Sequence, residues 1–315
     1  MAHKVTIIGA GSVGATIAYT MVTRGIASEI VLIDINKPKA LGEAMDIDQG
    51  TPYCKPVNIY AGEYEDAKDS DIVIITSGIA RKPGQSRLEL AQTNVNIIKD
   101  ITDKITKYAP DAIYIIVSNP VDVLTYAFLK YSGIPENQVI GSGTILDTAR
   151  LRAKIAQQYS INQQNVHALV LGEHGDTSFI PWSVASISNV PIENYWESIA
   201  YKETHSANFD YDEVTDFVRK SGGIIIERKG ATFYAIATCV CHICSCIFSG
   251  MDTALPVSTM IRDEYGIDDV CLSTLAIVGN KGVSGKVMLP LTDEETAKLQ
   301  ASAAKLKEVI KSINI

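Results

Sequence analysis

A histidine flanked by glycines has the surroundings best suited to chemistry in this sequence. His174 lies in the segment Gly-Glu-His-Gly-Asp-Thr at 172–177, directly after an apolar run at 166–171 that predicts a strand. Glycines leave room for a ligand beside the ring, and imidazole exchanges a proton near neutral pH. Of the five histidines, His174 is therefore the candidate for catalysis.

Charged side chains occur in two further segments. Asp147 and Arg150 are three residues apart at the start of a predicted helix, so they share one face of it; an acid and an arginine at that spacing are usually a surface ion pair. Segment 79–87 carries three cations, Arg81, Lys82 and Arg87, around a Pro-Gly turn. Such a loop is either solvated or a mobile lid that brings positive charge onto an anionic substrate.

The elements that must position these residues begin with a glycine-rich turn. An apolar strand at 5–8 runs into Gly9, Gly11 and Gly14, and a helix-compatible segment follows. Gly9 permits the turn, Gly11 permits close approach of a pyrophosphate, and Gly14 permits tight packing of helix on strand. A second strand ends in Asp34, where an acid accepts hydrogen bonds from ribose hydroxyls and repels a 2′-phosphate. This favours NAD over NADP. The alternative is a glycine turn in another α/β protein, with Asp34 merely ending a strand.

Strands alternate with helices through the first half of the chain, which predicts a doubly wound parallel (Rossmann) sheet. Two of these strands deliver polar or small residues, Ser77-Gly78 and Asn119, to the carboxyl edge where such sheets bind ligands. We place the domain boundary so that 1–142 is a dinucleotide-binding domain and 143–315 a mixed α+β substrate domain. Strands at 272–278 and 286–289 are expected to form a second sheet in the latter.

Bulk composition excludes several classes of protein. The 315 residues are 46% hydrophobic and 20% charged, which is typical of a globular protein. A net charge of −8 without a basic block argues against nucleic-acid or anionic-membrane partners. The N-terminus predicts no signal peptide and no apolar run is long enough to span a bilayer, so a cytoplasmic protein with reduced cysteines is expected.

Four of the six cysteines cluster at Cys239, Cys241, Cys244 and Cys246. Together with His242 they could hold a metal, but their helix-compatible, apolar surroundings favour small hydrophobic residues in a core helix. We therefore predict no metal site.

With its glycine turn, Asp34, the basic loop, Asn119, Leu-Asp-Thr-Ala-Arg at 146–150 and Gly-Glu-His-Gly-Asp at 172–176 in this order, the chain resembles the lactate/malate dehydrogenase family. The resemblance covers nearly the whole length. It implies hydride transfer between NAD(H) and a 2-oxo or 2-hydroxy acid. His174 would be the general acid and base, and Asp147 would orient its imidazole. The substrate carboxylate would bind Arg150.

The resemblance implies roles for further residues. Arg87 would close over the substrate carbonyl and polarise it, and Asn119 would bond near the reacting carbon and the carboxamide. The residues that match positions lining the dinucleotide, besides the three glycines and Asp34, are Val13, Lys39, Tyr64 and Gly78.

The identity of the substrate receives conflicting signals. In the family, an arginine at the position of Arg81 commonly accompanies oxaloacetate, and an arginine in a dry site needs a carboxylate partner, which favours malate. Gly-Ser-Gly-Thr at 141–144, Glu173 and Thr232 beside the expected side-chain pocket resemble lactate dehydrogenases instead. We favour an L-lactate dehydrogenase acting on pyruvate, with malate dehydrogenase as the alternative.

Two residues resemble an effector site. Arg152 and His167 match the pair that binds fructose 1,6-bisphosphate in many bacterial lactate dehydrogenases, with His167 expected on the same strand as His174. The alternative is that Arg152 is a surface arginine and His167 an ordinary strand histidine, without an effector. The resemblance also implies a homotetramer, since the effector pair is usually shared between subunits. An alternative function of a different class is a non-catalytic NAD-binding redox sensor that uses the cysteine cluster.

Overall fold

The computed structural model describes residues 3–79, 87–200 and 209–315. Arg81 lies outside these residues. Within them, no helix has the length and apolar character needed to cross a membrane.

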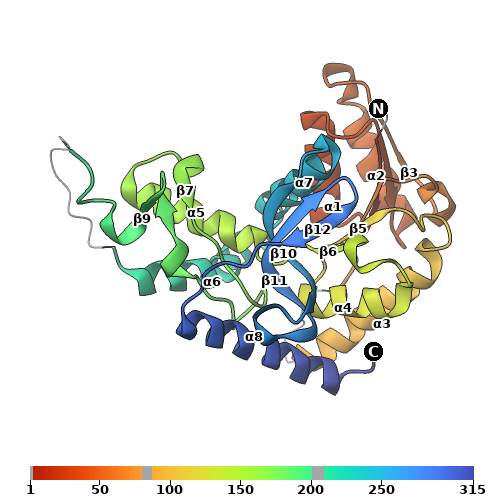
Figure 1. Cartoon of the computed structure of the whole chain (residues 1–315). Helices are drawn as coiled ribbons and strands as arrows, with labels where there is room; N and C mark the ends of the chain where they lie inside the picture. Colours follow the sequence, from red (N-terminus) through yellow and green to blue (C-terminus); the bar gives the residue numbers. More distant parts are fainter. Residues whose placement is uncertain (1–2, 80–86, 201–208) are drawn as a thin grey trace.

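The first part of the chain forms a doubly wound parallel sheet, as predicted. Its strands lie in the order β3-β2-β1-β4-β5-β6, and all five pairings are parallel. The strands are β1 (Lys4–Ile8), β2 (Glu29–Ile33), β3 (Asn58–Ala61), β4 (Ile72–Ile75), β5 (Ile113–Ile116) and β6 (Val139–Gly141). Figure 1 shows this sheet edge-on beneath the N-terminus.

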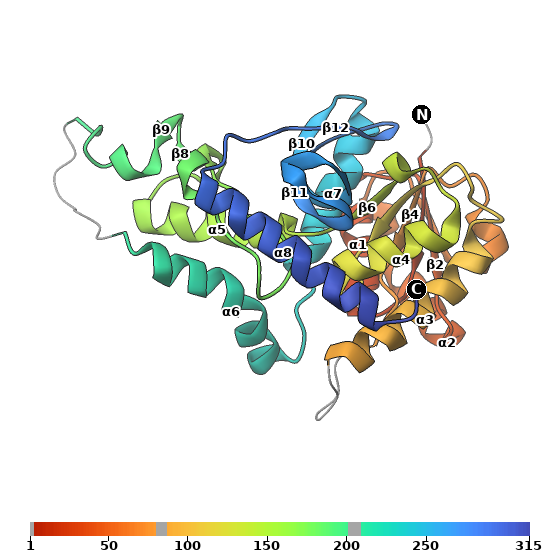
Figure 2. The same ribbon diagram turned by 60° about the horizontal axis from the view of Figure 1, so that its bottom comes forward.

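Alternating apolar side chains bury both faces of the sheet. Ile7, Leu32 and Ile74 belong to one core, which α1 (Ser12–Arg24), α2 (Lys37–Asp48) and α7 (Tyr234–Ser249) complete. Ile8 and Val73 belong to the opposite core. The helices of that core are α3 (Arg87–Ile105), α4 (Val121–Ser132) and α8 (Asp293–Ser312). In Figure 2, α8 runs along the outside of the molecule past α4.

The prediction that 272–278 and 286–289 form a second sheet is wrong. The antiparallel strands β10 (Thr253–Arg262), β11 (Asp268–Gly279) and β12 (Gly282–Lys286) continue the parallel sheet beyond β6, which gives one sheet of nine strands. The connection is made where Ser258 of β10 pairs with Gly141 of β6. The chain turns back before Gly282 to pair with β11, so the last strand begins earlier than predicted and ends at Lys286, and residues 287–289 lie outside a strand.

A separate lobe carries the small sheet β7 (Val166–His167), β8 (Ser186–Ile187) and β9 (Val190–Pro191). It packs on α5 (Ile145–Tyr159) and α6 (Tyr211–Lys229) around a core rich in aromatic residues. Figure 1 shows this lobe standing apart from the parallel strands.

The predicted strand at 166–171 stops at His167, so His167 and His174 do not share a strand. At Ala168 and Val170 the backbone bonds to side chains of α5 and of Thr144, which precedes it. The Arg152 Nε donates to the Ala168 carbonyl (3.0 Å), and the Val170 N–H donates to the Thr148 hydroxyl (2.9 Å). These bonds fix α5 against the segment that leads to His174.

Candidate active site

The backbone around His174 is held by three different elements. Gly172 pairs through both backbone groups with Ser273 of β11. The Glu173 N–H donates to the Ser302 hydroxyl on α8 (2.8 Å), and the His174 N–H donates to the Asp122 carboxylate on α4 (2.8 Å). The position of His174 thus depends on contacts with parts of the chain that are distant in sequence.

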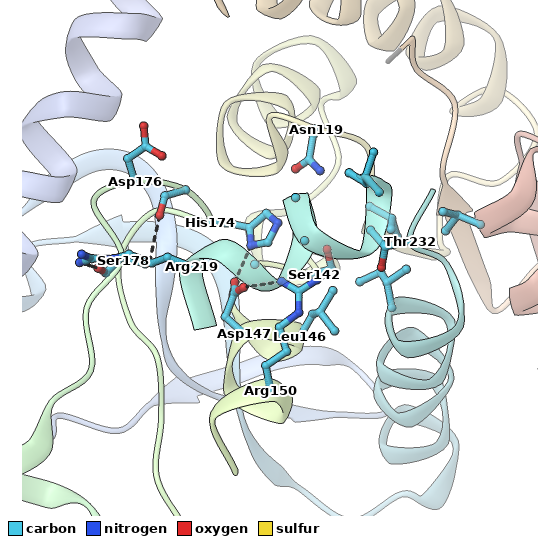
Figure 3. Close-up of a pocket in the computed structure, with 18 residues that line it drawn as sticks. Asn119, Ser142, Leu146, Asp147, Arg150, His174, Asp176, Ser178, Arg219 and Thr232 are labelled. Carbon is cyan, nitrogen blue, oxygen red and sulfur yellow. Dashed lines mark hydrogen bonds and ion pairs between the residues drawn. The ribbon is translucent and has the colours of Figure 1, made fainter. Parts of the chain in front are cut away.

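The imidazole of His174 is bonded to the acid that the resemblance assigned to it. Its Nδ1 lies 2.5 Å from Asp147 Oδ2, and Arg150 Nη1 donates to Asp147 Oδ1 at 3.1 Å. Figure 3 shows the Asp147 carboxylate between the ring and the guanidinium. The pair of Asp147 and Arg150 is therefore part of a buried cluster and not a surface ion pair, since the two side chains are only 9% and 13% exposed.

Electrostatics in this cluster favour the cationic form of the imidazole. Burial lowers the pKa of His174, but the charge and hydrogen bond of Asp147 and the charge of Asp122 outweigh it, and the net pKa is raised. Burial raises the pKa of Asp147, but His174 and Arg150 reverse this and hold it below its usual value. Asp147 thus stays ionised beside a ring that can carry a proton at neutral pH.

These residues open onto a cavity of about 320 Å³. Asn119 and Thr232, both predicted for the site, line it together with His174, Asp147 and Arg150. Figure 3 shows Asn119 and Thr232 pointing into the space around His174 from different elements. The volume lies within the range of small-molecule sites, roughly 300–1,000 Å³.

The glycine turn between β1 and α1 is closely packed on the protein side and open on the other. Gly9 has φ +107°, and a Cβ on Gly14 would lie 1.9 Å from the Gly9 carbonyl oxygen. A Cβ on Gly11 would meet no atom within 4 Å. The turn therefore leaves free space at Gly11, beside the N-terminus of α1, where a pyrophosphate would bind.

Asp34 lies at the end of β2 with its carboxylate against this turn. Its oxygens accept the N–H groups of Ala10 (2.7 Å) and Asn36 (2.8 Å). A carboxylate has about four acceptor sites, so capacity for ribose hydroxyls remains. The residues present thus fit an NAD whose adenosine lies at Asp34 and whose phosphates lie at Gly11.

Val13 and Gly78, both predicted to line the dinucleotide, line a second cavity of about 310 Å³, which shares Val13, Val117 and Asn119 with the first. Lys39 is exposed on the first turn of α2, and Tyr64 is half-buried against the second core. Neither Lys39 nor Tyr64 lines these two cavities. Arg87 is the first residue of α3.

Sequence reasoning missed Asp122 and Asn94. Asp122 is 2% exposed, and burial raises its pKa to about 6. The signal that could have revealed it is an acid in the apolar first turns of a buried helix. Asn94, 1% exposed, accepts the Ile79 N–H (2.9 Å) and donates to the Asn119 carbonyl (2.7 Å), so it joins the segments that follow β4 and β5.

The cysteine cluster forms part of a helix core. Cys239, Cys241, Cys244 and Cys246 are buried in α7, and burial raises the pKa of Cys239 to about 11 and of Cys241 to about 12. These thiols are therefore protonated at neutral pH. Among the residues that the structure describes, no group of three or more His, Cys, Asp and Glu side chains is arranged to hold a metal.

Of the expected effector residues, Arg152 lies on α5 and His167 is the last residue of β7. The bond from Arg152 to the Ala168 carbonyl places its guanidinium beside the residue after His167, and His167 is exposed. Burial, followed by the charges of Arg152 and Arg24, lowers the pKa of His242 on α7. Arg152 and Arg24 thus lie close enough to His242 to disfavour its cationic form.

Comparisons with known proteins identify the family. Residues 3–141 match the NAD binding domain of lactate/malate dehydrogenase, and residues 144–314 match its alpha/beta C-terminal domain. Similar proteins include an L-lactate dehydrogenase of Clostridium botulinum (strain Loch Maree / Type A3), 47% identical over 98% of this chain and 96% of the relative. Another, from Acetivibrio thermocellus, is 44% identical over 99% of this chain and 98% of the relative.

Solved structures agree in fold over the whole length. A lactate dehydrogenase from a Medee basin deep-sea metagenome library has a TM-score of 0.94 at 39% identity, covering 99% of this chain and 98% of the other. The minor L-lactate dehydrogenase of Enterococcus mundtii has a TM-score of 0.94 at 37% identity, covering 100% and 99%. The chain therefore belongs to the lactate/malate dehydrogenase family and is an NAD-dependent 2-hydroxy acid dehydrogenase.

Proposed function

We propose that this enzyme is an L-lactate dehydrogenase that interconverts pyruvate and L-lactate. The observation that carries the proposal is the bonded group His174, Asp147 and Arg150 at the wall of the cavity. The names of the relatives from Clostridium botulinum and Acetivibrio thermocellus support the choice of substrate. We retain the division into a cofactor domain at 1–142 and a substrate domain at 143–315, and a cytoplasmic location.

Bound NADH supplies the hydride that reduces the keto carbon. His174 donates the proton of its Nε2 to the carbonyl oxygen in the same direction of reaction, because its Nδ1 is engaged by Asp147. The negative charge of Asp147 stabilises the imidazolium before the transfer and fixes the orientation of the ring. In lactate oxidation, neutral His174 takes the hydroxyl proton.

Arg150 binds the substrate carboxylate. One of its nitrogens is occupied by Asp147, but a guanidinium has five N–H donors, so a carboxylate can still be held by two bonds. Arg87 polarises the carbonyl, and Asn119 bonds near the reacting carbon. Thr232 borders the side chain of the substrate. Gly9, Gly11, Val13, Gly14, Asp34, Lys39, Tyr64 and Gly78 bind the dinucleotide.

Malate dehydrogenase remains the second candidate because of Arg81. An arginine enclosed in a dry site would favour the extra carboxylate of oxaloacetate. The discriminating experiment measures NADH oxidation with pyruvate and with oxaloacetate at equal low concentration. We expect pyruvate to react faster, and the reverse order would assign the enzyme to malate.

We further propose that fructose 1,6-bisphosphate activates the enzyme through Arg152 and His167 in a homotetramer. Support comes from the bond of Arg152 to the carbonyl of Ala168, the residue after His167, and from the exposure of His167. The effector should lower the pyruvate concentration needed for half-maximal rate, and Arg152→Ala should abolish this response. An unresponsive parent enzyme would refute the allosteric proposal.

The dehydrogenase and the redox-sensor alternative predict different effects of thiol modification. Because the four thiols of α7 are buried and protonated, alkylation of the native dehydrogenase should leave turnover intact. Loss of NADH binding upon alkylation, together with no turnover of any 2-oxo acid, would favour the sensor.

A further inference from the structure

The turn that carries His174 packs against a buried hydroxyl of α8. Ser302 lies on this helix and is 0% exposed. The other buried residues of the helix include Leu299, Ala303 and Leu306, so an apolar side chain would suit the position. A hydroxyl in such surroundings costs free energy unless it is hydrogen-bonded. The partners of this hydroxyl therefore indicate why a serine lies here.

Ser302 bonds to the chain on both sides of His174. Its Oγ accepts the Glu173 N–H at 2.8 Å and lies 2.8 Å from Thr177 Oγ1. The Thr177 hydroxyl donates to Glu173 Oε2 at 2.5 Å. Because a hydroxyl has one hydrogen to donate, the bond between Ser302 and Thr177 must use the hydrogen of Ser302. The three residues thus form a closed cycle of hydrogen bonds.

The backbone of this turn has little room to move toward α8. A Cβ on Gly172 would lie 2.9 Å from Ser302 Oγ and 3.3 Å from Ser302 Cβ. Gly172 also pairs through its backbone with Ser273 of β11. The turn at 172–177 is thus held by β11 and by α8 together.

The members of the cycle act at a distance from the reacting atoms. Ser302, Glu173 and Thr177 are not among the described residues that line the active-site cavity, whereas His174 and Gly175, which lie between the two anchored positions, do line it. Removal of the Ser302 hydroxyl would leave the side-chain partner of the imidazole in place but would free the backbone on both sides of it. The position of the imidazole relative to the substrate would then be less well defined.

We propose that Ser302 is a positioning residue for proton transfer, because through Glu173 and Thr177 it fixes the turn that presents the His174 imidazole to the substrate carbonyl. This inference rests on the proposed function and adds a residue outside the cavity on which the reaction depends. The alternative is that Ser302 only stabilises the packing of α8. The two roles predict different kinetics.

The test uses Ser302→Ala, which removes the hydroxyl at a helix position where alanine is favourable. The matched control is Ser70→Ala. Ser70 is also buried, and its hydroxyl also lies 2.8 Å from a threonine hydroxyl, that of Thr6. Because Ser70 precedes β4, which is parallel to β1, it lies at the opposite end of these strands from the glycine turn. Both variants thus lose a buried hydroxyl bond, but only one loses it beside the turn of His174.

The measurements are kcat for pyruvate reduction in H₂O and in D₂O, the NADH dissociation constant and the melting temperature. In Ser302→Ala we expect kcat to fall by about tenfold, since a small misplacement of a reacting group lowers the rate steeply. The solvent isotope effect on kcat should increase, because proton transfer then takes a larger share of the barrier. The NADH dissociation constant should stay at the parent value, since the glycine turn is untouched. Ser70→Ala should lower the melting temperature and leave kcat and the isotope effect unchanged.

A second pair of variants tests the cycle without changing α8, and it decides the matter if Ser302→Ala does not fold. Thr177→Val removes the hydroxyl at nearly constant size, and Thr177→Ser keeps it. Thr177→Val should lower kcat and raise the isotope effect as Ser302→Ala does. Thr177→Ser should retain most of the parent rate.

Two results would overturn the inference while leaving the proposed function standing, since the parent enzyme would still reduce pyruvate. One is a folded Ser302→Ala variant with the kcat and isotope effect of the parent. The other is equal kcat in Thr177→Val and Thr177→Ser. If the folded, NADH-binding parent reduces no 2-oxo acid at all, then the proposed function fails and the inference fails with it.

Discussion

The turn at which a cofactor pyrophosphate would bind is made of backbone, and the substrate side of the active-site cavity is made of side chains. Gly9, Gly11 and Gly14 belong to one turn between β1 and α1. By contrast, His174 is held by residues of α4, α5, α8 and β11. The three glycines are thus close together in sequence, whereas the residues that hold His174 come from distant parts of the chain.

The sharpest way to separate the two sides is to remove the imidazole. We expect His174→Asn to lower kcat by about a thousandfold, since general acid catalysis contributes roughly 10²–10⁴. The dissociation constant for NADH, measured by fluorescence titration, should change little because the glycine turn is untouched. The matched control is His242→Asn, an exposed histidine of α7. A variant that retains high turnover would exclude His174 as the proton donor.

The converse test breaks the cofactor side. In Gly14→Ala the new Cβ would lie 1.9 Å from a backbone oxygen that cannot move aside, so we expect the free energy of unfolding to fall by a few kcal/mol. Gly11→Ala introduces a Cβ into open space, so the melting temperature should be retained while the NADH dissociation constant rises by about tenfold. Thermal unfolding and NADH titration of both variants check this. Equal melting temperatures for the two variants would contradict the assigned roles.

The smallest expected effect concerns the negative charge of Asp122, whose carboxylate accepts the His174 N–H. Because the pKa of His174 is raised, its protonated form persists to higher pH, and pyruvate reduction should decline only as pH rises through that raised value. Asp122 contributes to the increase, together with Asp147, whereas burial and Arg150 oppose it. In Asp122→Asn the amide oxygen can still accept the His174 N–H, but the negative charge is lost.

We therefore expect the midpoint of the declining limb of kcat/KM to move to lower pH in Asp122→Asn, by about one unit or less. The measurement is a pH profile across about pH 5 to 9, the range in which histidine titrates. Asp46→Asn, on the exposed face of α2, is the control. A midpoint that stays in place or moves upward would show that Asp122 does not act on the imidazole through its charge.

The same contrast explains which features could be predicted from the sequence. The parallel strands and the glycine turn follow from local apolar runs and from spacing. The grouping of His174 with Asp147 and Arg150 came from resemblance to a family, because no spacing brings residue 174 to residue 147. Asp122 was missed for the same reason, since its partner is a backbone N–H that lies far away in sequence.

The errors in the second half have a common physical cause. Strand β10 contains Pro256, which reads as a strand breaker, and its partner β6 is a short strand from the first half. The segment 168–171 is apolar enough for a strand, but Arg152 and Thr148 bond to the backbone of Ala168 and Val170. In both places tertiary contacts decided the local structure.

The pairing of Ser258 with Gly141 has a practical consequence for attempts to divide this enzyme. Because the sheet continues across position 142, truncation there would strip β6 of its neighbour and leave an unpaired edge strand prone to aggregation. The dinucleotide-binding half is thus poorly suited to isolation as a fragment or to exchange between relatives, and hybrids would need to carry β10–β12 along with it.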